Sequence, residues 1–109
     1  MMLTAPRAVL AAFAFSLAAS AHAAGDIEAG RIKANTCMGC HGIPNYNNAY
    51  PTYRVPLLGG QHPDYIVTAL KEYRDGKRPH PTMRAQGAGL ADQDIEDIAA
   101  YLAKAPAHQ

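Results

Sequence analysis

The sequence predicts an all-α domain in which three main helices are joined by long loops. Three segments place apolar residues at helical spacing, no segment shows the clean alternation of a half-buried strand, and the connecting stretches are rich in proline and glycine. The chain has only 109 residues, and so small a core usually needs a disulfide, a metal or a cofactor to be stable. We therefore expect the long loops to wrap around something other than protein, such as a bulky apolar cofactor.

The N-terminal segment has the three parts of a secretory signal. Arg7 supplies a positive charge, residues 8–19 form an uncharged apolar stretch, and the Ala-His-Ala sequence at residues 21–23 is typical of a cleavage site. The apolar stretch is shorter than the roughly 20 residues that a membrane-spanning helix needs. We therefore expect a cleaved signal over residues 1–23, to within two residues. The mature domain, residues 24–109, is expected to be soluble, without stable membrane insertion, and located in a bacterial periplasm.

The first two helices carry recognisable end signals. The first is expected from Asp26 to Cys37, with the Asp26 side chain as its N-terminal cap. The second begins at His62-Pro63, because proline suits the first helical position, where its missing N–H would be unpaired anyway. Gly76 can end this helix in the left-handed conformation.

The third helix is expected over residues 92–104. Its apolar residues recur at i, i+3, i+4 and i+7, as Ile95, Ile98, Ala99 and Leu102. Its acidic residues, near the helix start where the macrodipole favours them, are Asp92, Asp94, Glu96 and Asp97. We expect residues 42–61 and 76–91 to be loops.

The balance of charge excludes two classes of protein. The chain has 10 basic and 9 acidic residues, and Arg7 lies in the signal. A neutral mature domain argues against a nucleic-acid binder and against a polybasic membrane-surface protein. Because no Ser/His/Asp pattern, paired loop carboxylates or phosphate-binding glycine motif is present, we predict no catalytic residues.

Residues 37–41 read Cys-Met-Gly-Cys-His, the C-x-x-C-H sequence of c-type haem attachment. Two thiols one helical turn apart can each add to a vinyl group on one edge of a porphyrin. His41 then lies over the ring face, where its Nε2 can bind iron. We therefore expect one haem c, with its iron, linked through Cys37 and Cys40. These links would hold a cofactor that so small a protein could not retain by burial alone.

Three other uses of the cysteine pair have less support. A thioredoxin-type pair needs a preceding strand and a βαβ unit, and neither is visible. A zinc site needs a second pair of ligands, and the chain has only 2 cysteines. A disulfide that closes so short a loop would stabilise the fold little. Haem attachment is therefore the favoured interpretation.

The iron of an electron-transfer haem needs a second axial ligand. Met83, in the loop expected before the third helix, is the favoured candidate, and a thioether ligand raises the reduction potential. His80 is its rival, three residues away. Met38 lies within the attachment turn and cannot cross the ring, His62 is expected to begin a helix, and His108 lies in the C-terminal tail. If Met83 is not a ligand, an open iron site could bind CO, NO or O₂ or act as a peroxidase.

With these residues in place, the sequence resembles the small class I cytochromes c of bacteria, in particular the cytochrome c553/c4-type haem domain. The resemblance covers about residues 25–103 and implies three main helices with long loops wrapped around one covalently attached haem. It rests on residues 25–30, the haem turn at residues 37–42, the segment Pro-Leu-Leu-Gly-Gly-Gln-His-Pro-Asp-Tyr at residues 56–65, Met83, and residues 89–95.

The resemblance implies roles around the haem and at one helix crossing. His41 would be the proximal ligand and Met83 the distal ligand. Pro56 would offer its carbonyl to the Nδ1–H of His41, a contact that orients a ligating histidine, and Leu58 would pack on the haem.

Two further residues matter for the helices. Gly30 would let the first helix cross the last one closely, against Tyr101. The sequence departs from the family at Ala91, where a serine or threonine cap is usual, and Asp92 is the alternative cap.

These features predict a one-electron carrier, not an enzyme, whose iron cycles between Fe(III) and Fe(II). Its partners would be redox proteins such as a periplasmic dehydrogenase, a cytochrome complex or a terminal oxidase. The chain could equally be the electron-accepting haem subunit of a larger periplasmic dehydrogenase. Residues 71–84 are rich in basic side chains and residues 92–104 in acidic ones. Such a dipole could orient a partner, or the two segments could simply be solvated helix faces.

Overall fold

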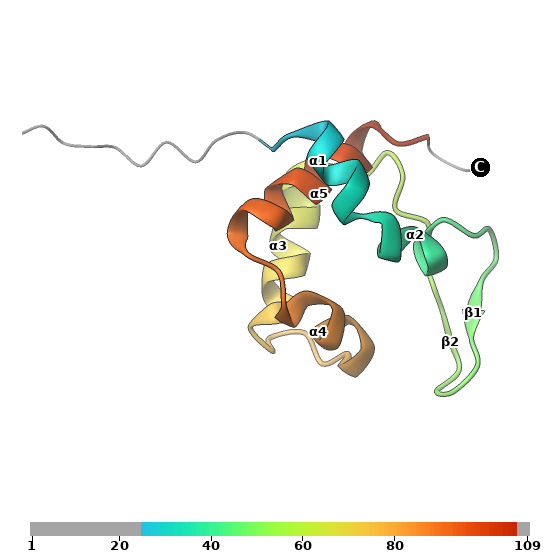
Figure 1. Cartoon of the computed structure of the whole chain (residues 1–109). Helices are drawn as coiled ribbons and strands as arrows, with labels where there is room; N and C mark the ends of the chain where they lie inside the picture. The colour runs from blue at the N-terminus through green and yellow to red at the C-terminus, as the bar shows by residue number, and fades with distance from the viewer. Residues whose placement is uncertain (1–24, 107–109) are drawn as a thin grey trace, which may run out of the picture.

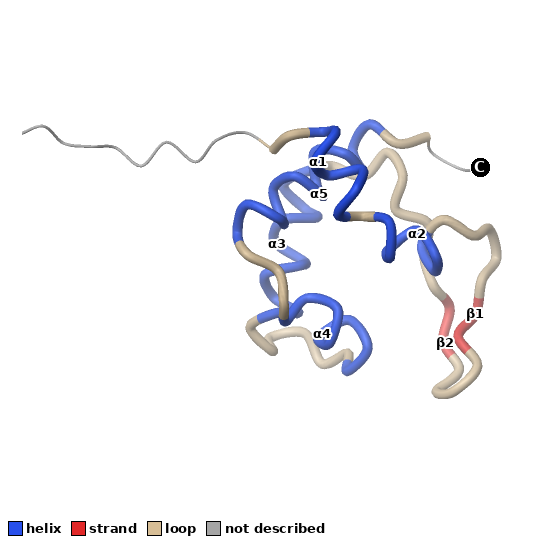
Figure 2. The backbone as a smooth tube through the Cα atoms, viewed as in Figure 1, coloured by secondary structure: helices blue, strands red, loops and turns tan. Residues whose placement is uncertain are grey.

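Five helices and one short hairpin make up the described part of the chain, residues 25–106 of the computed structural model (Figure 1). The helices are α1 (Ile27–Lys33), α2 (Asn35–His41), α3 (Pro63–Arg74), α4 (Pro81–Ala88) and α5 (Asp92–Lys104). The strands β1 (Asn47–Asn48) and β2 (Tyr53–Arg54) pair antiparallel and are red in Figure 2. The all-α class is confirmed, and no described helix is both long and apolar enough to span a bilayer. The expected signal over residues 1–23, with Arg7, and the tail residue His108 lie outside the described residues.

The core lies where α1 and α3 pack against α5 (Figure 1). Its buried apolar residues are Ala34, Ile66, Leu70, Ile95, Ile98, Ala99 and Leu102. Those on α5 come from a single face, at the spacing that predicted this helix. Among the described elements, α4 packs only against α3, so α4 lies at the edge of this core.

The close crossing of α1 over α5 depends on Gly30. A Cβ atom at this position would collide with the carbonyl oxygen of Asp97 and lie 2.9 Å from the Cβ of Tyr101. The predicted crossing of the first and last helices at Gly30 and Tyr101 is therefore confirmed. A second glycine, Gly25, approaches the backbone of Glu96 in the same way.

Gly30→Ala is expected to destabilise the domain. Alanine gains about 1 kcal/mol in helix propensity, but the collision with the α5 backbone forces the two helices apart. We expect a net loss of about 2 kcal/mol in unfolding free energy, measured by chemical denaturation. Gly89→Ala is the matched control, because a Cβ there meets nothing within 4 Å. Equal stability of the two variants would contradict this account of the crossing.

A buried carboxylate also joins α1 to α5. Asp97, one of the four acids expected near the start of the last helix, is only 3% exposed. It accepts hydrogen bonds from the Asp26 N–H (2.8 Å), Lys33 Nζ (2.6 Å) and Gln93 Nε2 (2.9 Å). Lys33 also pairs with Asp94 at 2.8 Å. The Lys33 ammonium, with the other two donors, lowers the pKa of Asp97 to about 2.

Acidification is expected to weaken this contact as Asp97 becomes protonated. Its folded-state pKa of about 2 lies below the ordinary value of 3.8. Its stabilisation is therefore complete above about pH 5 and is lost as the pH falls toward about 2. In Asp97→Asn this titration is gone, so Tm should be lower at neutral pH and should fall less on acidification.

Melting curves of the holoprotein between about pH 7 and pH 3 measure this difference. Glu28→Gln is the control, because the Glu28 side chain is 78% exposed and should leave the pH dependence as in the wild type. If the Tm curves of Asp97→Asn and the wild type run parallel, Asp97 does not carry the acid sensitivity.

Three predicted helix ends are confirmed. Asp26 caps α1, and its carboxylate accepts a hydrogen bond from the Ala29 N–H at 2.9 Å. Pro63 is the first residue of α3. Gly76 follows that helix with a φ of 77°, in the left-handed region.

The start of α5 decides between the two caps considered for it. Ala91 is the N-cap residue, and Asp92 is already the first residue of the helix. The carboxylate of Asp94 accepts a hydrogen bond from the Ala91 N–H at 2.9 Å. Asp92 therefore does not replace the missing serine or threonine, and Asp94 stabilises the helix start instead.

The predicted extent of the first helix, residues 26–37, is wrong. α1 ends at Lys33, and α2 begins at Asn35 and continues to His41. The residue between them, Ala34, is fully buried and has a ψ of 0°. Asparagine and threonine follow it, and both have low helix propensity. The chain therefore changes direction here, and the whole C-x-x-C-H sequence lies on α2.

Both predicted loops contain regular structure. Residues 42–61 include the hairpin, and residues 76–91 include α4. α4 begins at Pro81, behind an N-cap formed by the His80 side chain. Gly87 allows it to pack closely against α3. These elements are too short to be stable without tertiary contacts, which explains why no periodicity predicted them.

Candidate functional site

A cavity of about 430 Å³ lies among α2, α3, α4 and the chain around β2. Figure 1 shows α2 and the hairpin on one side of this region and α3 and α4 on the other. The cavity walls include every residue predicted to contact the haem, namely Cys37, Cys40, His41, Pro56, Leu58 and Met83. Its volume is in the range of cofactor sites.

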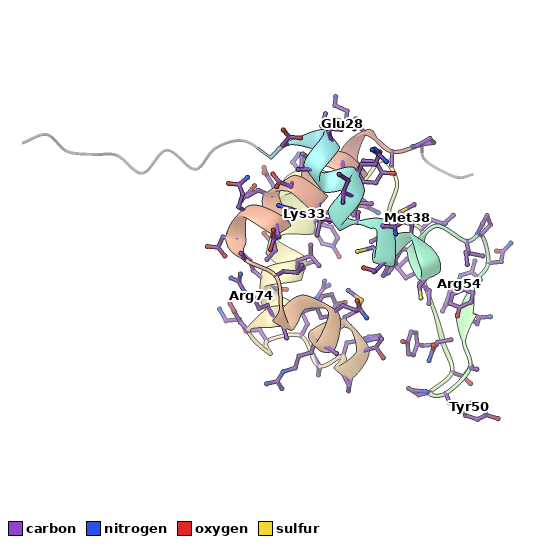
Figure 3. The ribbon with its side chains drawn as sticks, viewed as in Figure 1. Glu28, Lys33, Met38, Tyr50, Arg54 and Arg74 are labelled. Atoms are coloured by element: carbon purple, nitrogen blue, oxygen red, sulfur yellow. The ribbon has the colours of Figure 1, made fainter. Side chains whose placement is uncertain are left out.

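The two cysteines lie one turn apart on α2, and both line the cavity. Both are free thiols, Cys37 half-buried and Cys40 exposed, so they form no disulfide. Burial raises the pKa of the Cys37 thiol. Met38, labelled in Figure 3, lies between them in the same turn. Two sulfur atoms from one turn can therefore reach neighbouring positions on one ligand edge.

His41 is the last residue of α2 and is held by a backbone contact. Its Nδ1 lies 2.7 Å from the carbonyl oxygen of Pro56. Because a carbonyl can only accept, Nδ1 carries the proton, and the lone pair of Nε2 is left for a metal. The hydrogen bond expected between these two residues is therefore present, and it restrains the rotation of the imidazole ring.

Met83 lines the cavity from α4. It is the third residue of that helix, half-buried, and packs against the apolar core. The prediction that Met83 lies in a loop is therefore wrong, because the His-Pro sequence before it begins a helix. Its thioether is a soft ligand suited to haem iron.

The structure separates the other axial candidates. His80 also lines the cavity, whereas Met38 and His62 do not. His80 Nδ1 accepts a hydrogen bond from the Met83 N–H at 3.2 Å, so the ring proton is on Nε2, and His80 can bind a metal only if it loses that proton or that hydrogen bond. Within residues 25–106, Met83 and His80 are therefore the two candidates for the distal side.

Several polar or amphipathic residues of the cavity were not predicted as site residues. Among them are Arg54, Tyr65, Tyr73 and Arg78. The guanidinium of Arg78 lies 5.0 Å from the ring centroid of Tyr73 and 5.9 Å from that of Tyr65. The two tyrosines lie on α3 and Arg54 lies on β2, and nothing in the local sequence links them. Only the fold brings these residues to one wall.

The chemistry of the walls fits a haem. Two thiols, an imidazole and a thioether provide the covalent and axial donors. Apolar residues such as Ile66, Leu70 and Ile98 can cover the porphyrin faces. Arg54 and Arg78 place positive charge where acidic substituents of a ligand could lie. A covalently attached haem would contact the donor atoms, the apolar residues and the two arginines.

Comparison with known proteins agrees with this chemistry. The family model "Cytochrome c" matches residues 28–106. Cytochrome c4 from Pseudomonas aeruginosa is 43% identical over 83 residues, which are 76% of this chain and 40% of that protein. Cytochrome c-554(548) from Halomonas halodenitrificans is 44% identical over 81 residues, 72% of this chain and 94% of that protein.

The fold has a counterpart among solved structures. Reduced recombinant cytochrome c4 from Pseudomonas stutzeri superposes with a TM-score of 0.57 and 25% sequence identity, covering 76% of this chain and 52% of that one. The chain thus spans about half the length of the cytochrome c4 proteins that it matches. It spans nearly all of the Halomonas protein.

Proposed function

Because this chain belongs to the cytochrome c family, we propose that it is a periplasmic electron carrier with one haem c and His/Met axial ligation. The observation that carries the proposal is the placement of Cys37, Cys40, His41 and Met83 on the walls of one cavity, from two separate helices. Haem bound there supplies reversible one-electron chemistry between Fe(III) and Fe(II).

On the proximal side, α2 supplies both cysteines and the histidine of the proposed haem site. Cys37 and Cys40 would hold the haem edge through thioethers, and His41 would bind its iron through Nε2. The Pro56 carbonyl accepts the Nδ1–H of His41 at 2.7 Å. This contact keeps the ring in one orientation and makes Nε2 a stronger donor.

On the distal side, Met83 would bind iron through its thioether, a ligand that favours Fe(II) and raises the potential. Leu58, Ile66 and Leu70 line the cavity and would shield the haem from water. A ligand set that stays in place in both oxidation states, in an apolar surrounding, suits rapid electron transfer rather than turnover of a substrate.

Sequence features support the number of haems and the location. The chain contains one C-x-x-C-H and no other cysteine, which supports a single haem c. The features of residues 1–23 support export to the periplasm.

Redox proteins are the proposed partners. The charge asymmetry between residues 71–84 and α5 gives little guidance to their docking, because Arg74 pairs with Asp92 at 2.7 Å and joins the two segments. Purification in a fixed ratio with a periplasmic dehydrogenase would assign the chain to that enzyme as its electron-accepting subunit. Purification alone as a haem protein supports a free carrier.

The test of the proposal is an optical spectrum of protein exported from a host with cytochrome c maturation. We expect sharp α and β bands after reduction by dithionite, a methionine–iron(III) charge-transfer band in the oxidised form, and no response to CO. A high-spin spectrum that shifts under CO would contradict the proposal and indicate a gas-binding or peroxidatic haem.

A further inference from the structure

Two helices of this chain begin with the same His-Pro dipeptide, and only one of the two histidines acts as a cap. His62 precedes α3 and makes no side-chain capping bond. His80 precedes α4, and its Nδ1 accepts a hydrogen bond from the Met83 N–H at 3.2 Å. Because Nδ1 is the acceptor, the ring proton is on Nε2.

The capping bond ends on the residue proposed as the distal ligand. Met83 is the third residue of α4, the position whose N–H a capping side chain usually satisfies. α4 has 8 residues, fewer than a helix needs to be stable in isolation. The first turn of α4, which carries Met83, therefore depends on contacts from outside the helix.

The ring of His80 is itself held between two tyrosines. Its centroid lies 4.8 Å from that of Tyr53 and 6.0 Å from that of Tyr73, and both pairs meet edge to face at 77°. Tyr53 belongs to β2 and Tyr73 to α3. His80 thus joins the hairpin, α3 and the first turn of α4 at the wall of the cavity.

The other end of α4 is anchored separately. Gly87 lies so close to α3 that a Cβ there would be 3.2 Å from the backbone nitrogen of Arg74. This contact holds the C-terminal end of α4, whereas its first turn is held by the His80 cap together with the packing of Met83 against the core. We propose that His80 is a positioning residue, which fixes the Met83 thioether at the distal side through its hydrogen bond to the Met83 backbone. This inference rests on the proposed role of Met83 as axial ligand.

Three variants of the exported holoprotein test the role of His80. His80→Phe keeps an aromatic ring between the two tyrosines but removes the acceptor. His80→Asn removes the ring but restores an acceptor, since asparagine is among the best N-cap residues. His62→Phe is the matched control at the N-cap of α3, where no capping bond exists. The readouts are the methionine–iron(III) band and the affinity of the oxidised protein for imidazole, which competes with Met83 for iron.

We expect His80→Phe to bind imidazole about fivefold more tightly than the wild type, as loss of a cap predicts, with a weaker methionine–iron band. His80→Asn should recover to within about twofold, and His62→Phe should match the wild type. The positioning role would be overturned if His80→Phe behaved like the wild type, or if His80→Phe and His80→Asn were equally impaired. In either case, a methionine–iron(III) band in the wild type would still support Met83 as the ligand. A wild type without that band would overturn the ligation and this inference together.

Amide hydrogen exchange of the wild-type holoprotein gives a test that needs no variant. The Met83 N–H must be protected if it donates to His80 as the structure has it. Rapid exchange at this amide would overturn the positioning role even if His80→Phe fails to mature.

Discussion

Met83→Ala is expected to leave the haem attached but to convert the protein to a high-spin or ligand-exchanged form. Alanine removes the thioether that α4 brings to the cavity, whereas Cys37, Cys40 and His41 on α2 are untouched. Loss of a ligand that favours Fe(II) should lower the reduction potential by at least about 0.1 V, within the roughly 0.8 V that axial ligands span. Redox titration and the methionine–iron(III) band measure the change.

Met38→Ala is the control for this experiment. Met38 is half-buried like Met83 and packs against the same core, but it does not line the cavity. Its replacement should leave the spectrum and the potential as in the wild type. An unchanged spectrum and potential in Met83→Ala would rule out Met83 as the ligand and direct attention to His80, the other distal candidate.

Cys37→Ala and Cys40→Ala are each expected to reduce the yield of stable holoprotein by at least about tenfold. Each thioether tethers the haem, so that its remaining contacts form at a high effective concentration, and loss of one thioether lowers that concentration. Burial of the haem edge cannot replace a lost thioether, because Cys40 is exposed and Cys37 is only half-buried. Covalent haem per polypeptide, measured after denaturation, gives the yield.

Gly39→Ala is the matched control for the two cysteine variants. It lies between them in the same turn of α2, and a Cβ there meets nothing within 4 Å. The variant keeps the spacing of both thiols and should mature at the wild-type yield. Full yield of normal holoprotein from either cysteine variant would contradict attachment through both sulfur atoms.

Much of the helical framework could be predicted because its signals are local. The periodicity of Ile95, Ile98 and Leu102 predicted α5, and these residues are fully buried in the core. Pro63 and Gly76 marked the two ends of α3. Such signals act through the backbone of the same segment, so they can be interpreted without knowing what the helix packs against.

Short elements could not be predicted in this way. α4 and the hairpin have too few residues for periodicity, and the break at Ala34 depends on burial of that residue against α5 and α3. His80-Pro81 carries the same signal as His62-Pro63, but a helix of 8 residues needs its cap and its contact with α3 to form. Its stability is a property of the assembled fold.

The sequence by itself predicted the chemistry that we propose for this protein. The spacing of Cys37, Cys40 and His41 is a covalent requirement of one cofactor, and it holds wherever the segment lies in space. The sequence also favoured Met83 as the distal ligand, and a resemblance over about residues 25–103 added Pro56 and Leu58.

Only the tertiary structure decided which side chains from distant segments of the chain contact one another. It buried Asp97 under α1, where three donors lower its pKa to about 2. It also brought His80 between Tyr53 and Tyr73, from segments far apart in the chain. Hydrogen bonds and ring contacts of this kind depend on distances between elements, and those distances are set only when α1 and α3 have packed on α5.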